Sequence, residues 1–245
     1  MLNILYEDAA IIVCVKEAGV ATQTRQIGQK DMESMLRTYR MQKGEASYIG
    51  VVHRLDQPVS GVMVFAKTKE TAANLSRQVS TKAADKYYYA VTDGVPERAK
   101  GTLEDYLLRN GKTNLSKVVS AKETGAKRAE LSYEVLEVRD DRALLNIKLA
   151  TGRHHQIRVQ FAAVGHPLVG DAKYGGREDG GCGVFDGSDK RTGNGSVGRS
   201  RTQGGQPLAL CSCRLVFIHP DTKEVMEFHT TPTGAGFHEW KKALG

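Results

Sequence analysis

The polar turn at residues 53–61 and the apolar run after it constrain the fold of this chain more than any other stretch. Residues 62–66 are all apolar, a pattern that is typical of a buried strand. Inside the turn, Asp56 stands two residues after Arg54. A guanidinium beside a carboxylate favours the ionised form, which is the form that acts as a nucleophile. An Asp that only caps the backbone of its own turn explains the same residues, so two interpretations remain open at this point.

The composition is that of a globular protein with an excess of positive charge. The 245 residues can form one large domain or two small ones, and 40% of them are apolar. The net charge of +7 favours a polyanionic partner such as nucleic acid. No stretch approaches the roughly 20 apolar residues of a membrane span, and residues 1–8 lack the pattern of a signal peptide. We therefore expect a cytoplasmic protein, with a monomer as the default state.

The four cysteines do not form a recognisable metal or disulfide pattern. Cys211 and Cys213 lie two residues apart on an expected strand, so their thiols point to the same face. Such a pair can be half of a zinc site, but no second Cys or His pair of suitable spacing completes it. We predict small buried thiols, no structural metal and no disulfide.

Hydrophobic periodicity predicts interspersed helices and strands. Helical spacing occurs in three segments: residues 31–42, 68–82 and 153–164. Asp31 and Thr68 are suitable N-caps for the first two, and Gly165 is a suitable C-cap for the third. Strand patterns occur at residues 4–6, 11–16 and 87–91, and in a hairpin that spans 131–149. Because these elements show no regular βαβ alternation, we predict an α+β fold with a mainly antiparallel mixed sheet flanked by helices.

Residues 176–205 differ from the rest of the chain. Ten of these thirty residues are glycine, and almost none is apolar. Such a composition does not repay the entropy of ordering, so we predict a flexible insertion. An arm that contacts RNA through its arginines is the alternative, although nearby acidic residues almost cancel their charge.

Two long motifs resemble the signatures of the RluA-type RNA pseudouridine synthases. The first is His-Arg-Leu-Asp at residues 53–56, with Ser-Gly at 60–61. The second is Thr-Gly-Arg-His-His-Gln-Ile-Arg at 151–158, with Gly-His-Pro-Leu-Val-Gly-Asp at 165–171 and Tyr-Gly at 174–175. The resemblance implies the pseudouridine synthase catalytic fold in a single domain over residues 1–245. Many relatives carry a small S4-type domain before this region, and we expect none here because the matched motifs leave no room for one.

The resemblance further implies the reaction and its main participants. Specific uridines in ribosomal or transfer RNA would be isomerised to pseudouridine, without a cofactor or a metal. Asp56 would be the catalytic carboxylate, and the sequence leaves open whether it attacks the sugar or removes a 2′ proton. Arg158 would pair with this acid, and Tyr88, in the Lys-x-Tyr-x-Ala pattern at residues 86–90, would stack on the base.

Five further residues are candidate RNA contacts. By resemblance, Arg54 would displace the target uridine from its stack. Arg153, His154 and His155 follow Thr151, which is a candidate helix N-cap, and a helix N-terminus is a common phosphate site. His154 lies four residues before Arg158, on the same face of the expected helix. His53 is the fifth candidate, and for this residue we favour a structural hydrogen bond over a role as a proton shuttle.

Two other functions fit parts of the pattern. A non-catalytic RNA-binding or chaperone protein on the same scaffold would not need Asp56, because a carboxylate facing phosphates weakens binding. A carboxylate-dependent glycosidase needs two acids that flank one bond. The only motif-embedded partner for Asp56 would be Asp171, which we predict to be a structural turn residue.

Overall fold

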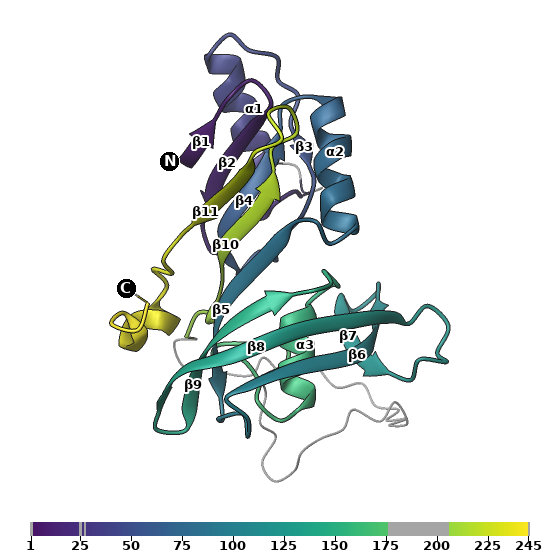
Figure 1. Cartoon of the computed structure of the whole chain (residues 1–245), viewed down its shortest axis with the longest axis vertical. Helices are drawn as coiled ribbons and strands as arrows, with labels where there is room; N and C mark the ends of the chain where they lie inside the picture. Colours follow the sequence, from purple (N-terminus) through teal and green to yellow (C-terminus); the bar gives the residue numbers. More distant parts are fainter. Residues whose placement is uncertain (1, 25, 27, 176–205, 245) are drawn as a thin grey trace.

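In the computed structural model, which describes residues 2–24, 26, 28–175 and 206–244, the chain forms a long, twisted sheet flanked by a few helices (Figure 1). The strands are β1 (Asn3–Glu7), β2 (Ile11–Lys16), β3 (Gly50–Val51), β4 (Ser60–Ala66), β5 (Asp85–Asp93), β6 (Lys100–Asn110), β7 (Leu115–Val119), β8 (Lys127–Arg139), β9 (Arg142–Leu149), β10 (Leu210–Ile218) and β11 (Val225–His229). The helices are α1 (Met32–Gln42), α2 (Lys69–Ser80), α3 (Gln156–Ala163) and the short 3-10 helix η1 (Ala235–Trp240).

The described strands join in one sheet with the order β1-β2-β4-β10-β5-β9-β8-β6-β7, while β11 pairs with β10 and β3 with β4. Every pairing is antiparallel except that of β4 with β10. The predicted α+β fold with a mainly antiparallel mixed sheet is therefore confirmed. Within this order, β10 lies between the half that contains β4 and the half that contains β5 (Figure 1).

Strand β4 is buried on both faces, as its continuous apolar run predicts. Val62 and Val64 pack in one cluster with Leu75 of α2. Met63 and Phe65 point to the opposite face and pack in the cluster that includes α1. The alternation of side chains along a strand thus places the two helices on opposite faces of the sheet. The cluster on the α1 face continues to α3, so this face carries the larger core.

Helices α1 and α2 begin where their capping residues predict. The Asp31 carboxylate accepts a hydrogen bond from Ser34 N at 2.8 Å, and the Ser34 hydroxyl in turn accepts from Asp31 N. Thr68 Oγ1 accepts from Thr71 N at 3.1 Å. Each side chain satisfies a backbone N–H that has no partner inside the helix.

Helix α3 is shorter than the sequence predicts, and the assignment of Thr151 as its N-cap is wrong. The side chain of Gln156 accepts from Arg153 N at 2.9 Å and from the Thr151 hydroxyl at 2.8 Å, which holds the preceding residues in a separate turn. His155 occupies the N-cap position with a left-handed φ of 54°. Gly165, with φ 83°, follows the helix as expected. The hydrogen bonds of the Gln156 side chain outweigh the helical pattern here.

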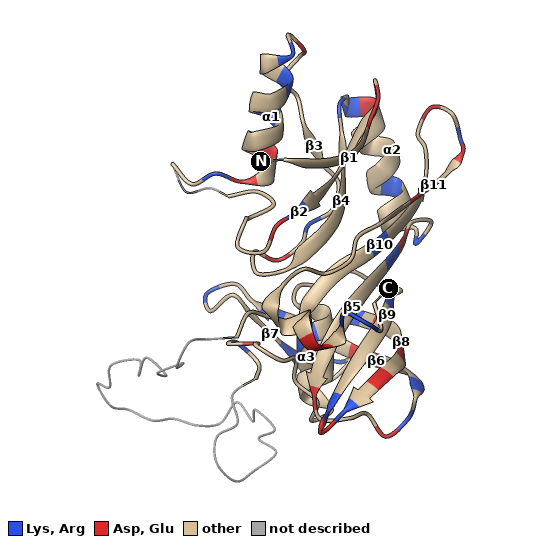
Figure 2. Ribbon diagram, turned by 90° about the vertical axis from the view of Figure 1, so that its left-hand side faces the viewer, with Lys and Arg blue, Asp and Glu red and all other residues tan. Residues whose placement is uncertain are grey.

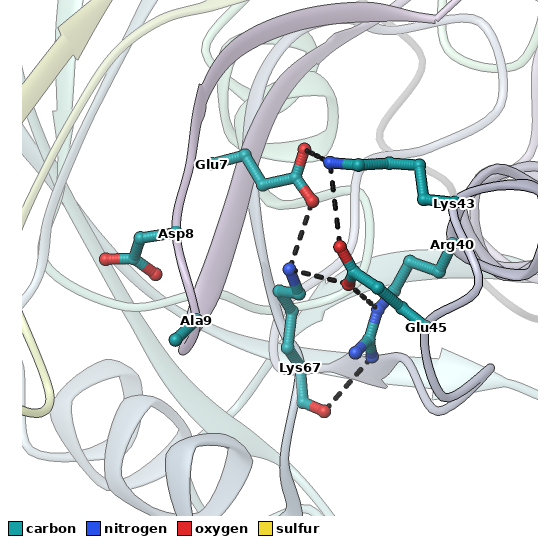
Figure 3. Close-up of a pocket in the computed structure, with 7 residues that line it drawn as sticks. All are labelled: Glu7, Asp8, Ala9, Arg40, Lys43, Glu45 and Lys67. Atoms are coloured by element: carbon teal, nitrogen blue, oxygen red, sulfur yellow. Dashed lines mark hydrogen bonds and ion pairs between the residues drawn. The ribbon is translucent and has the colours of Figure 1, made fainter.

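A network of charged side chains fastens the end of β1 to the end of α1 (Figure 3). Lys67 is buried, and its Nζ lies 3.0 Å from Glu7 Oε1 and 2.8 Å from Glu45 Oε2. Lys43 pairs with Glu7, and Arg40 pairs with Glu45. Because each charge in the network has an opposite partner, we interpret it as a structural feature.

The predicted insertion at residues 176–205, which includes Cys182, lies outside the described residues. Cys14, Cys211 and Cys213 are buried free thiols. Among the described residues, no helix is long and apolar enough to cross a membrane.

Gly61 allows the close approach of β4 and β10. Its φ is 134°, and a Cβ at this position would collide with the backbone of Ser212, its partner on β10. We expect Gly61→Ala to lower the free energy of unfolding by about 2–4 kcal/mol, because overpacking and a positive φ each cost about 1–3 kcal/mol. Urea denaturation measures this change. Gly111→Ala is the control, because a Cβ there would meet no other atom, and an equal loss in the two variants would contradict this explanation.

Candidate active site

The loop that carries Asp56 connects β3 to β4 and is anchored in the core. Leu55 and Val59 are both buried in the large hydrophobic cluster. Val59 N donates to Asp56 O at 3.0 Å, which closes a tight turn around the acid. Asp56 itself keeps 28% of its side chain exposed. The loop therefore presents one partly accessible carboxylate from a rigid base.

Lys16 supports this loop, although sequence reasoning did not select it. It is fully buried at the end of β2, and its Nζ donates to the carbonyl oxygens of Val20 at 2.6 Å, Glu17 at 3.0 Å and Gln57 at 3.1 Å. Burial lowers the pKa of Lys16 to about 8, and the negative charge of Asp56 acts in the opposite direction. The sequence did contain a signal for this role: a lysine at the end of an apolar strand pattern. A lysine buried in such a place needs hydrogen-bond acceptors around its ammonium group.

The pairing of Asp56 with Arg158, which the motifs imply, is present in the structure. Arg158 Nη1 lies 3.3 Å from Asp56 Oδ2, although the two residues are 102 positions apart. The guanidinium is held more tightly by Asp171, with Nε 2.8 Å from Oδ2 and Nη2 2.6 Å from Oδ1. Burial disfavours the charged guanidinium, but the hydrogen bonds and charge of Asp171 outweigh it and raise the pKa of Arg158. Asp171 therefore fixes the cation that faces Asp56.

Asp171 is also the turn residue that the sequence predicts. Its Oδ1 accepts from Lys173 N at 2.9 Å and from Tyr174 N at 3.2 Å. The sequence interpretation missed its second contact, with Arg158. A carboxylate has enough lone pairs to accept hydrogen bonds from a turn and from a cation together, so the turn role does not exclude the ion pair.

Tyr88 lies on the face of β5 that points to the same core as the Asp56 loop. It is 6% exposed and packs in the cluster that contains Leu55 and Ile157, the neighbours of Asp56 and Arg158. Burial raises the pKa of Tyr88, while a hydrogen bond with the Ser212 side chain acts in the opposite direction. Its hydroxyl is therefore neutral at physiological pH. Tyr87 points to the opposite face, as predicted, where it contacts Lys148 and Arg214.

The two adjacent histidines lie beside Asp56 but differ in their contacts. His155 is buried, with Nε2 3.6 Å from Asp56 Oδ2 and Nδ1 2.8 Å from the Tyr174 hydroxyl. His154 stacks on His155 with ring centroids 3.7 Å apart, and its Nδ1 lies 2.8 Å from Ser116 Oγ. The expected sharing of one helix face by His154 and Arg158 is wrong, because α3 begins only at Gln156.

The remaining candidate residues are less closely associated with Asp56. His53 Nε2 accepts from Val64 N at 3.1 Å, and burial together with the charge of Lys86 lowers its pKa to about 3. His53 thus makes the expected structural hydrogen bond. Arg54 is exposed and donates to Gln23 Oε1 at 3.1 Å. Arg153 is also exposed, and its Nε donates to Arg128 O at 2.8 Å.

Comparisons with known proteins agree on one family. The family model described as RNA pseudouridylate synthase matches residues 10–163. An uncharacterized RNA pseudouridine synthase of Bacillus subtilis is 36% identical over 71% of this chain and 58% of its own length. Ribosomal large subunit pseudouridine synthase C of Escherichia coli is 31% identical over 91% of this chain and 64% of its own length. The chain thus spans 58% and 64% of the lengths of these two relatives.

Solved structures give the same fold. Human RNA pseudouridylate synthase domain containing 1 superposes with a TM-score of 0.69 at 24% identity, covering 95% of this chain and 84% of that one. Human RNA pseudouridylate synthase domain containing 4 has a TM-score of 0.70 at 23% identity, covering 94% and 89%.

The buried ion pair of Arg158 with Asp171 should contribute to the stability of the fold. Arg158→Met would leave the Asp171 carboxylate, whose side chain is 0% exposed, without its cation. Removal of one partner of a buried ion pair typically costs about 3–5 kcal/mol, and we expect urea denaturation to show a loss of this size. Adding Asp171→Asn should restore part of it, because the amide oxygen can still accept from the turn. A loss below about 1 kcal/mol in the single variant, as for a surface pair, would contradict this account.

Proposed function

This chain belongs to the RNA pseudouridylate synthase family, with motifs of the RluA type, and from this premise we propose that it isomerises specific uridines in RNA to pseudouridine. In this reaction the C1′–N1 glycosidic bond breaks, the uracil turns, and C5 bonds to the same sugar carbon. Atoms and electrons balance without an external reagent. The observation that carries the proposal is the ion pair of Asp56 with the buried Arg158, at 3.3 Å.

In the proposed mechanism, Asp56 is the catalytic carboxylate. Attack on C1′ and removal of the 2′ proton both require an ionised acid, and the Arg158 guanidinium places a positive charge 3.3 Å from Asp56 Oδ2. Because Asp171 already holds two other nitrogens of the guanidinium, Arg158 cannot turn away from Asp56 without breaking a buried ion pair. The pair is therefore preorganised before the substrate enters.

We propose that Tyr88 contacts the target base. Its ring lies in the same cluster as the residues next to Asp56 and Arg158, and its hydroxyl keeps its proton because burial raises its pKa. A neutral tyrosine can stack on uracil and donate a hydrogen bond to it. Stacking of this kind contributes about 1–3 kcal/mol in nucleic-acid complexes.

The substrate proposed is ribosomal or transfer RNA, with ribosomal RNA favoured by the printed name of the Escherichia coli relative. Lys and Arg are spread over both halves of the sheet among acidic residues, so charge alone does not mark an RNA surface (Figure 2). The base must leave its stack before its glycosidic bond can be reached. The exposed Arg54, in the loop that carries Asp56, is suited to displace it, and the exposed Arg153 to contact the RNA backbone. A ribosomal substrate also agrees with the cytoplasmic location expected from the sequence.

The rival functions find less support in the site. A non-catalytic RNA-binding protein has no use for a carboxylate held by a buried cation. A two-acid glycosidase would need Asp171 to flank a sugar bond, but its side chain is 0% exposed and is bound to Arg158. The continuous sheet, in turn, supports the proposal that the chain functions as one catalytic domain.

Pseudouridine mapping on total RNA from the native host, with and without this gene, tests the reaction and identifies the substrate. We expect at least one pseudouridine to disappear on deletion and to return with the wild-type gene. If no site is lost, and the purified protein also fails on unmodified RNAs of the host, the non-catalytic RNA-binding function replaces this proposal.

Asp56→Asn tests the catalytic carboxylate. The amide has nearly the same size but cannot supply the negative charge, so we expect kcat to fall by about 10⁴-fold or more, as when a catalytic nucleophile is removed. The Kd for RNA should stay within about threefold, because Asp56 contributes no attraction to phosphates. Turnover close to that of the wild type would refute the assignment.

Tyr88→Phe separates the hydroxyl from the ring. Stacking is preserved, while the hydrogen-bond donor is lost, and we expect single-turnover rates to fall by about 10²-fold or more. Tyr87→Phe is the matched control, because Tyr87 lies on the other face of the same strand and should leave the rate unchanged. Equal rates for Tyr88→Phe and the wild type would exclude Tyr88 from the chemical step.

A further inference from the structure

We propose that His155 is a positioning residue for Asp56, and that Tyr174 and Ser116 fix its imidazole so that Nε2–H faces the carboxylate. This inference rests on the proposed function, because it gives His155 a part in preparing the acid rather than in contacting the RNA backbone. Three observations carry it: the buried position of His155, the hydrogen bond of its ring with the Tyr174 hydroxyl and the geometry around Asp56 Oδ2.

The backbone of His155 points to a function. Its φ of 54° lies in the left-handed region, where a side chain other than glycine is strained. Such conformations persist where the surroundings impose them, and they are concentrated at functional sites. Here the strained residue turns the chain directly before α3 and directs the ring to Asp56, at 3.6 Å.

The hydrogen bonds of Tyr174 select one tautomer of the imidazole. Ser116 N, a backbone donor on β7, donates to the Tyr174 hydroxyl oxygen at 2.9 Å. That hydroxyl lies 2.8 Å from His155 Nδ1 and can donate its own hydrogen there. An Nδ1 that accepts a hydrogen bond places the ring proton on Nε2. The opposite tautomer would leave the phenolic hydrogen without an acceptor in either contact.

The imidazole is neutral, so this choice of tautomer decides what faces Asp56. Burial lowers the pKa of His155 to about 3, and the positive charges of Arg158, His154, Lys173 and Arg109 add to the effect. A neutral ring carries one proton. With that proton on Nε2, His155 turns an N–H toward the carboxylate, at 3.6 Å and so just beyond hydrogen-bond distance. With the proton on Nδ1, it would turn a lone pair to a negative charge.

Arg158 and His155 then face the same oxygen of Asp56. Both contacts end on Oδ2, at 3.3 Å from Arg158 Nη1 and 3.6 Å from His155 Nε2. The described residues provide no hydrogen bond to Oδ1, so this oxygen is the one left to react. Hydrogen bonds at catalytic groups are often long without a substrate and shorten in its complex. The Nε2–H of His155, now 3.6 Å from Oδ2, is thus placed to come within hydrogen-bond distance when the uridine enters.

Two substitutions of His155 distinguish the contact made by Nδ1 from the contact made by Nε2. His155→Asn places an amide near the Nδ1 position, where it can still bond to Tyr174, but it has no donor that reaches Asp56. Asparagine also tolerates the left-handed backbone, so this variant should fold. His155→Gln carries an amide nitrogen near the Nε2 position and restores the donor.

We expect His155→Asn to lower kcat by about 10²-fold, which is the loss typical of a catalytic group displaced by about 1 Å. The Kd for RNA should not change. His155→Gln should recover at least about tenfold of this loss. Tyr174→Phe should lower kcat as well, and adding it to His155→Asn should cause little further loss, because Tyr174 acts through the ring. A weaker RNA affinity with an intact kcat in His155→Asn would overturn the proposal and make His155 an RNA contact.

The tautomer can be read without any RNA. In protein with isotope-labelled histidine, the imidazole nitrogen signals should show a protonated Nε2 and an unprotonated Nδ1 for His155, and a mixture of tautomers in Tyr174→Phe. A protonated Nδ1 in the wild type would overturn this proposal even if the enzyme modifies RNA. An inactive wild type would overturn the proposed function instead, and the two failures are therefore distinguishable.

Discussion

The buried guanidinium of Arg158 is the interaction on which the site depends. A cation with 4% of its side chain exposed requires compensating charge, and two carboxylates supply it from different parts of the chain. Asp171 binds it with two short hydrogen bonds and Asp56 with one longer contact. The stronger pair locks the arginine, so the weaker one is free to change during a reaction. The unequal distances thus agree with a structural role for Asp171 and with the chemical role proposed for Asp56.

Buried polar groups of the irregular backbone around Asp56 also have partners. Loops that enter a core must find partners for their carbonyl groups, and here one lysine, Lys16, serves three of them. Near the two histidines, Ser116 of β7 makes two hydrogen bonds: its backbone N–H donates to the Tyr174 hydroxyl, and its own hydroxyl contacts His154 Nδ1. The site therefore owes its rigidity to buried polar contacts more than to regular helices or strands.

The sequence predicts the features that depend on local patterns. Strand β4 and the starts of α1 and α2 follow from an apolar run and from the capping residues Asp31 and Thr68. The pairing of Asp56 with Arg158 could be anticipated only from the family motifs. Periodicity failed at the start of α3, where side-chain hydrogen bonds of Gln156 decide the backbone. The three acceptors of Lys16 and the pairing of Arg158 with Asp171 were not predictable, since they are brought together only by the tertiary fold.

The position of β10 has a consequence for how the protein is made. Asp56 belongs to the half of the sheet that ends with β4, and Tyr88 and Arg158 to the half that starts with β5. Among the described strands, only β10 is paired to both β4 and β5. Synthesis proceeds from the N-terminus at about 5–20 residues per second, so β10 emerges after every residue of the site. Until β10 pairs with β4 and β5, the strand that joins the two halves of the described sheet is missing. The last long strand of the described sheet thus completes the connection between its two halves.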